Sequence, residues 1–115
     1  MKTLKTNREF ARVFKQGKSA GHKDLVILGR KGRSKETRVG FCISRKTGNA
    51  VARNRLRRRL KEIIRHTGGI KPRWEIVIIA KPTSTSLSFQ DLQTLTEKLL
   101  TRLGVKVKVS PVAQP

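Results

Sequence analysis

One segment of the chain, residues 49–65, constrains the fold most, because it combines an apolar stripe with a dense basic face. Its apolar side chains recur at steps of four, four, three and one residue, the spacing of one face of an α-helix, and they are Ala52, Leu56, Leu60, Ile63 and Ile64. A second stripe at steps of four, widened by further arginines, consists of Arg53, Arg57 and Lys61 with Arg55, Arg58, Arg59 and Arg65. Such a helix buries its apolar face against the rest of the chain and can lay its basic face along phosphates.

The whole chain is strongly basic, with 28 Lys and Arg against 7 Asp and Glu in 115 residues and a formal charge of +21. No acidic residue occurs from Thr37 to Lys61. Self-repulsion on this scale costs stability, so a polyanionic partner is expected. Nucleic acid fits better than an anionic membrane, because Trp74 and the four Phe do not align as membrane anchors. A cytosolic acidic protein is a third candidate, with no feature in its favour.

Length and composition exclude several classes of protein. No apolar run approaches the roughly 18–20 residues of a membrane span, and the N-terminus lacks the pattern of a signal peptide. The single cysteine, Cys42, excludes an internal disulfide and a thiolate metal cage. We therefore expect a cytoplasmic protein with one domain over residues 1–109 and a short tail at 110–115.

The remaining pattern predicts an α+β fold, a small mixed sheet packed with three helices in the order α-β-β-α-β-α. Thr6 and Glu9 predict a capping box that starts a first helix, which stops at Gly17. Further helices are expected over 50–66, capped by Asn49, and over 88–103, followed by Gly104. Strands are expected over 25–28, 38–45 and 74–80, a loop over 29–36, and a weak edge strand over 105–109.

Two groups of residues are candidates for a ligand cleft. The strand over 38–45 places Gly40, Cys42 and Ser44 on one face, where a ligand could approach the backbone closely. Phe10 and Phe14 lie one helical turn apart. They fit either the core or a platform for single-stranded bases, with Arg12 and Lys15 as basic neighbours.

Catalytic and metal-binding constellations are not evident. The seven acidic residues are scattered, whereas a two-metal nuclease needs clustered carboxylates. His22 and His66 form no convincing acid–base pair, and Cys42 has no base partner. Asn54, between two arginines, fits a contact to a base edge, a ribose or a hydrated cation, or a tolerated surface position.

The stretch Arg45–Glu62, with Gly48-Asn49-Ala50-Val51 before Arg53-Asn54-Arg55 and further basic residues, closely resembles the signature of the bacterial ribonuclease P protein subunit. The resemblance extends to the first helix (8–17), to Arg38-Val39-Gly40 and to the run at 76–82. One departure is the first strand, 25–28, which lacks the aromatic that the family often places there. A leader cleft in this chain would therefore depend less on aromatic stacking and more on apolar contact and charge.

The resemblance implies that the chain is a subunit of ribonuclease P, the endoribonuclease that removes the 5′ leader of precursor tRNA. The chemistry would be carried by the RNA subunit with its Mg²⁺, and the protein would supply no catalytic residue and hold no cofactor or metal. Its partners would be ribonuclease P RNA and precursor tRNA, with one protein monomer in the ribonucleoprotein and no membrane. By bridging the two RNAs it would lower the Mg²⁺ requirement. The family also implies a left-handed β-α-β crossover, although about 98% of such crossovers in proteins are right-handed.

The implied RNA contacts follow position by position. Those to the catalytic RNA are Arg45, Lys46, Asn49, Arg53, Asn54, Arg55, Arg57, Arg58, Arg59, Lys61 and Arg65. Those of the leader cleft are Phe10, Phe14, Arg12, Lys15, Cys42 and Ser44. The alternatives are a ribosomal or other general structured-RNA-binding protein and a stand-alone tRNA nuclease.

Overall fold

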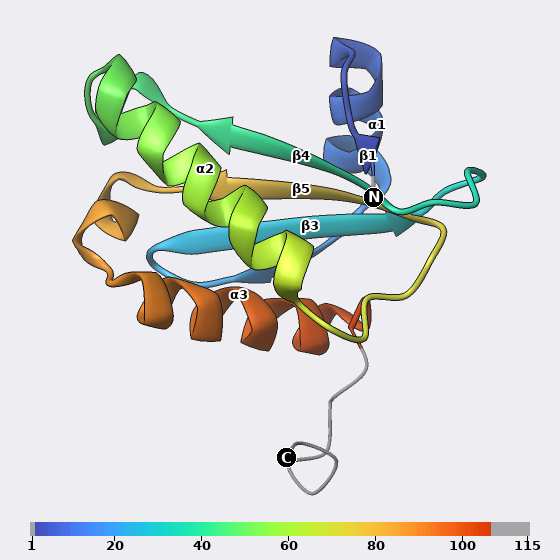
Figure 1. Ribbon diagram of the computed structural model, residues 1–115. Helices are drawn as coiled ribbons and strands as arrows, with labels where there is room; N and C mark the ends of the chain where they lie inside the picture. The colour runs from blue at the N-terminus through green and yellow to red at the C-terminus, as the bar shows by residue number, and fades with distance from the viewer. Residues whose placement is uncertain (1, 107–115) are drawn as a thin grey trace, which may run out of the picture.

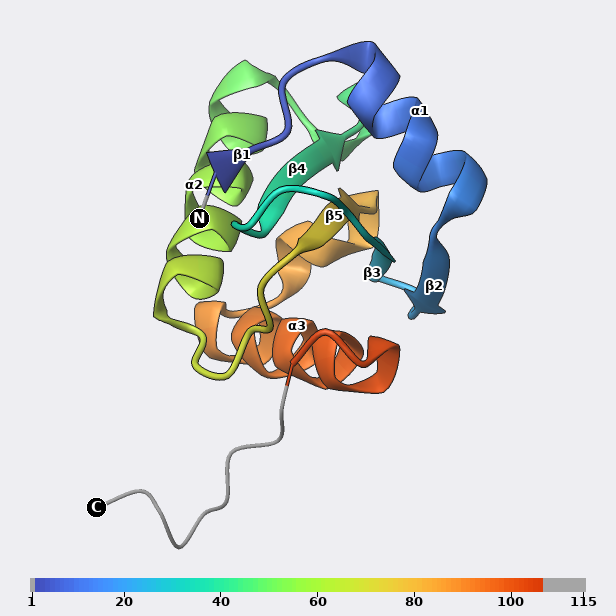
Figure 2. The same ribbon diagram turned by 90° about the vertical axis from the view of Figure 1, so that its right-hand side faces the viewer.

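In the computed structural model, which describes residues 2–106, a five-stranded mixed sheet carries helices on both faces (Figures 1 and 2). The helices are α1 (Asn7–Gln16), α2 (Ala50–His66) and α3 (Phe89–Leu103), with 3-10 turns η1 (Arg45–Thr47) and η2 (Pro82–Ser86). The strands are β1 (Lys2–Thr3), β2 (Lys18–Gly21), β3 (Leu25–Lys31), β4 (Arg38–Ile43) and β5 (Trp74–Ala80). The predicted α+β class is confirmed.

The sheet order is β1-β4-β5-β3-β2, so β5 occupies the centre. It pairs in parallel with β4 on one side and antiparallel with β3 on the other. Side chains on both of its faces are buried or half-buried. The continuous apolar run of β5 reflects this position, because a strand covered on both faces has no solvent side.

The connection from β4 through α2 to β5 is a left-handed crossover. In Figure 1 both strands run to the left, α2 lies in front of the sheet and β5 lies below β4. This arrangement confirms the handedness that the family resemblance implies. Local sequence rules favour the opposite hand.

The prediction of three strands and a weak edge strand was incomplete, because β1 and β2 were missed. β1 has two exposed residues and is held by backbone bonds, with the Lys2 N–H donating to Thr37 and the Leu4 N–H to Val39. β2 is polar apart from the buried Ala20. Neither segment shows an apolar period, so only pairing with a neighbouring strand defines it as a strand.

The predicted loop over 29–36 was also partly wrong, because β3 continues to Lys31. A side chain at Gly29 would collide with Leu103, so glycine here permits close packing of α3 rather than marking a turn. Of the predicted edge strand over 105–109, Lys106 forms a bridge to Ile70. Residues 107–109 and the predicted tail lie outside the described residues.

Two apolar clusters lie on opposite faces of the sheet. The larger one packs α2 and α3 against alternate residues of the strands, including Leu25, Ile27, Ile76 and Ile78. The smaller one lies under α1, where Leu4, Val13 and Val77 are buried, and around them lie the half-buried Phe10, Leu28, Cys42 and Ile79. Among residues 2–106, α1 is the only helix on this face (Figure 2), and the residues around it stay half-buried.

Candidate nucleic-acid interface

The helix α2 forms as its sequence predicts. The Asn49 side chain accepts a hydrogen bond from the Ala52 N–H at 2.9 Å and so caps the first turn. Its apolar stripe packs against the sheet and α3, and its buried residues are Leu56, Leu60, Ile63 and Ile64. This packing fixes the direction of every basic side chain on the helix.

The basic side chains of α2 cover three sides of the helix rather than one face. Arg53 and Arg57 lie on the same side of the helix as Lys61, and both are half-buried. On the opposite side Arg55 and Arg59 line a small depression with Thr85 of η2. The outward crest consists of the exposed residues Asn54, Arg58 and Arg65, and Arg45 and Lys46 of η1 extend the exposed basic surface beyond the capped end of the helix.

The only acidic residue of this helix is neutralised locally. Glu62 pairs with Arg65 at 3.3 Å and with His66 at 2.7 Å, both within the next turn. The Asn54 side-chain oxygen accepts a hydrogen bond from the Arg57 guanidinium at 3.1 Å. Asn54 therefore positions Arg57, a role that sequence reasoning did not assign to it.

The Arg53 side chain is half-buried. Its Nε is buried and has no hydrogen-bond partner among the described residues. Arg53 is thus only partly available to a ligand, whereas Arg55 and Arg58 are exposed.

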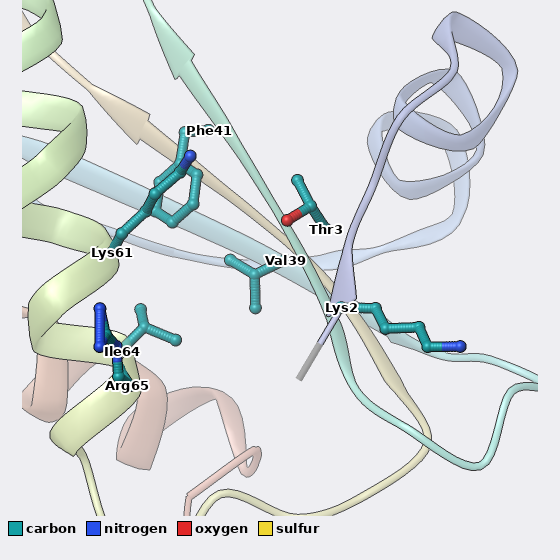
Figure 3. A pocket seen from close by; sticks show the side chains of 7 residues that line it. All are labelled: Lys2, Thr3, Val39, Phe41, Lys61, Ile64 and Arg65. Carbon is teal, nitrogen blue, oxygen red and sulfur yellow. The ribbon is translucent and has the colours of Figure 1, made fainter.

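A groove of about 370 Å³ runs between α2 and the β4–β1 edge (Figure 3). Lys61, Ile64 and Arg65 line it from α2, Val39 and Phe41 from β4, and Lys2 and Thr3 from β1. In Figure 3 Lys61 and Arg65 lie opposite the face of β4 that carries Phe41, while Lys2 points away from α2. Sequence reasoning missed Phe41 and Lys2, because Phe41 lies on the face of β4 opposite the predicted ligand face and no pattern revealed β1.

The helix α1 is fixed by its capping box. The Thr6 hydroxyl accepts from the Glu9 N–H at 3.2 Å, and the Glu9 carboxylate accepts from the Thr6 N–H at 3.0 Å. Burial raises the pKa of Glu9, but hydrogen bonds from Thr6 and Lys5 and the nearby Arg38 guanidinium outweigh it, so this pKa lies below its ordinary value. Glu9 also pairs with Arg38 of β4, which ties the start of α1 to the sheet.

The two flanks of α1 differ in chemistry. Val13 is buried at the centre, and successive residues turn by about 100° in an α-helix, so Arg12 and Phe14 point to opposite sides. Phe10 and Phe14 share one side, where the Phe10 ring covers Gly40 and Phe14 is 47% exposed. We call this side the aromatic flank; beside it lie the half-buried Leu28, Cys42 and Ile79.

The structure brings together only part of the predicted leader cleft. Phe10 and Cys42 belong to one cluster, and Phe14 follows on the same side of α1. Arg12 lies on the other flank, in a pocket with Arg30 and Arg38. Lys15 is exposed on the outward side of α1. The Ser44 hydroxyl accepts a hydrogen bond from the Lys46 N–H and caps η1.

Cys42 provides a direct reporter of this flank, because it is the only cysteine in the chain. Burial raises the pKa of its thiol, so little thiolate exists near neutral pH and alkylation is expected to be slower than that of a free thiol. A single-stranded RNA bound along the aromatic flank should slow alkylation further. Mass spectrometry with and without the RNA measures this, and an unchanged rate at saturating RNA would place the strand elsewhere.

These features define a class of small, basic α+β domains in which an arginine-rich helix occupies a left-handed crossover and an apolar flank lies open on the other face. The family model for ribonuclease P matches residues 1–104. The chain belongs to the ribonuclease P protein family, the protein component of a tRNA-processing endonuclease.

Known relatives agree with this assignment. The chain is 39% identical over 108 residues to the ribonuclease P protein component of Clostridioides difficile, which covers 92% of this chain and 95% of that protein. It is 38% identical over 102 residues to that of Thermotoga maritima, covering 87% of each.

Solved structures show the same fold. The Staphylococcus aureus RNase P protein superimposes with a TM-score of 0.85 at 27% identity, covering 93% of this chain and 99% of that one. The Thermotoga maritima protein gives a TM-score of 0.79 at 32% identity, covering 89% and 97%.

Residues 2–106 contain neither a membrane-spanning helix nor a cluster of metal-ligating side chains. No helix in this range is both long enough and apolar enough to cross a membrane. No group of three or more His, Cys, Asp or Glu side chains in the same range converges in a way that fits a metal ion.

Proposed function

We propose that this chain binds the RNA subunit of ribonuclease P through α2 and η1, and binds the single-stranded 5′ leader of precursor tRNA along the aromatic flank of α1. In this role it assists Mg²⁺-dependent removal of the leader and contributes no catalytic group. The observation that carries the proposal is the arrangement of the arginine-rich helix and the aromatic flank on opposite faces of one sheet.

The charge on α2 supports contact with a folded RNA. Exposed guanidinium groups donate paired hydrogen bonds to phosphate oxygens and keep their charge at any physiological pH. Because exposed and half-buried basic side chains together cover three sides of the helix, α2 can contact phosphates on more than one RNA segment at once. The only carboxylate of the helix is engaged by Arg65 and His66, so it repels phosphates little.

The aromatic flank supports contact with unpaired nucleotides. Phe14 presents an exposed ring, and the half-buried Leu28, Cys42 and Ile79 beside α1 add apolar surface. Bases stack on such surfaces with little sequence preference, which suits leaders that differ between tRNAs. Family relatives often carry an aromatic residue on the first strand, so stacking in this chain depends more on the α1 rings.

For Mg²⁺, the protein side chains of residues 2–106 do not fit a resident site, since no three acidic, His or Cys groups converge. We propose that the ion is held by RNA. The protein's contribution is then electrostatic, because a chain of charge +21 placed between two polyanions reduces their repulsion and the Mg²⁺ needed to screen it.

The decisive experiment combines the protein, a bacterial ribonuclease P RNA and a 5′-labelled precursor tRNA at low Mg²⁺. Leader release at the mature 5′ end is expected only when both protein and catalytic RNA are present. Cleavage by the protein alone would make the chain a nuclease in its own right. Absence of stimulation would favour a general structured-RNA-binding role instead.

Phe14→Ala is expected to weaken binding of precursor tRNA by the assembled holoenzyme roughly 5- to 150-fold, the loss of one stacked base at about 1–3 kcal/mol. Folding should be little affected, because the ring is 47% exposed. The matched control is Phe89→Ala, which removes a ring that is 41% exposed at the start of α3. Affinity measured for substrates with and without a leader tests this, and equal losses for both substrates would contradict a leader contact.

A further inference from the structure

The flank of α1 opposite the phenylalanines forms a pocket of about 530 Å³ rich in arginine. It is lined by Arg12 and Gln16 of α1, by Arg30, Arg38 and Glu75 of three neighbouring strands, and by Arg33 and Ser34 of the β3–β4 loop. We call it the arginine pocket. The signature motif of the family does not include it, and the proposed RNA contacts of α2 lie on the other face of the sheet.

The floor of the arginine pocket is one row of side chains across the sheet. Arg30 and Arg38 each lie directly opposite Glu75 in the strand register, one on either side of it. Side chains in such positions are within contact distance of each other. The row therefore places two guanidinium groups around one carboxylate.

Glu75 orients part of this row. Its carboxylate is 5% exposed and accepts a hydrogen bond from the Arg30 guanidinium at 2.6 Å. Gly32 lies so close to it that a side chain there would collide with the Cγ of Glu75. The bond engages one nitrogen of Arg30, and a guanidinium has five N–H donors, so Arg30 is held in place with further donors to offer.

The charge of the pocket is not balanced by the protein. Arg38 pairs with Glu9 and Arg30 with Glu75, whereas Arg12 and Arg33 have no carboxylate partner among residues 2–106. Two guanidinium groups without a carboxylate partner thus line the same cavity as two paired ones. Like charges brought together repel, and a bound anion with several oxygens relieves that repulsion.

We propose that the arginine pocket is a phosphate-binding site that holds a phosphodiester group of RNA. Arg12 and Arg33 supply the uncompensated charge, while Arg30, set by Glu75, supplies an oriented donor. The site stands on the pocket alone; only the identity of the RNA that supplies the phosphodiester rests on the proposed function. The leader and the catalytic RNA both carry this chemistry.

The first test uses the protein alone with inorganic phosphate at constant ionic strength. Amide resonances of Gln16, Gly32 and Arg33 should shift in a saturable way in nuclear magnetic resonance spectra. The double variant R12Q/R33Q should bind phosphate at this position at least tenfold more weakly; both side chains are exposed, so the fold should be retained. The control K98Q/R102Q removes two exposed charges from α3 and should leave the shifts unchanged.

The second test identifies the RNA. If R12Q/R33Q weakens holoenzyme affinity for precursor tRNA with a long leader but not with a very short one, the phosphodiester belongs to the leader. If it weakens binding to the catalytic RNA without substrate, the phosphodiester belongs to that RNA. Unchanged affinity in both assays would overturn the RNA assignment, and phosphate shifts that persist in R12Q/R33Q would overturn the site itself. A wild-type protein that binds phosphate here but fails to stimulate cleavage would contradict the proposed function and leave the site intact.

Discussion

Replacing Arg55, Arg58 and Lys61 together by glutamine is expected to weaken binding of ribonuclease P RNA on the order of a hundredfold or more at physiological salt. All three side chains are exposed on α2, so the loss falls on binding and not on packing. Each phosphate contact removed should also lower the slope of log affinity against log salt by about one. Fluorescence anisotropy over a series of salt concentrations measures both effects.

The matched control for this experiment removes three exposed basic residues away from α2, as K23Q/K98Q/R102Q. It has the same net charge as the α2 variant, so a general loss of electrostatic attraction would affect both equally. A site-specific interface predicts that only the α2 variant shows the large loss. Equal salt slopes for the two variants would show that α2 is not the RNA-binding surface.

Gly40→Ala is expected to disturb the aromatic flank. A methyl group at this position overlaps the Phe10 ring and approaches Leu4, because α1 rests directly on the β4 backbone. Overpacking of this kind costs about 1–3 kcal/mol, unless Phe10 swings away from the sheet. We expect a lower melting temperature, by about 4–8 °C for each kcal/mol, and weaker binding of leader-containing substrate.

Two further variants separate the collision from the loss of a glycine. In the double variant F10A/G40A the collision is absent, so the two changes should combine less than additively in their free energies of unfolding. Gly68→Ala, at a position with open space, should have little effect on the melting temperature. Strict additivity of the two changes would mean that Phe10 does not rest on Gly40 in solution.

The local elements were predictable because their signals are local. The Thr6–Glu9 capping box, the Asn49 cap and the Gly104 helix end all appear where the residue types place them, with Gly104 at φ 87°. The buried and exposed sides of α2 follow from its periodicity alone. Strands β1 and β2 were missed, because their residues carry no apolar period and are strands only through their neighbours.

The candidate site was predictable in part, for a similar reason. Basic residues on α2 are adjacent in sequence, so their common surface follows from one helix. Arg12 was grouped with Phe10 and Phe14 by proximity in sequence, yet the helix turns it to the opposite flank. For Asn54 the sequence left open an RNA or cation contact and a tolerated surface position, whereas in the structure its side chain holds Arg57.

By itself the sequence determined the three helices, the apolar face of each, the strongly basic charge and, through its signature, the family. The left-handed crossover was implied by the family resemblance and not by any local pattern, and the tertiary structure confirms it. Only the tertiary structure decided the meeting of Arg30, Arg38 and Glu75 in one row. Helix caps and apolar periodicity involve residues only a few positions apart, so the sequence alone predicts them. Strand register joins residues far apart in the chain, and it is set by which faces of the sheet the helices bury.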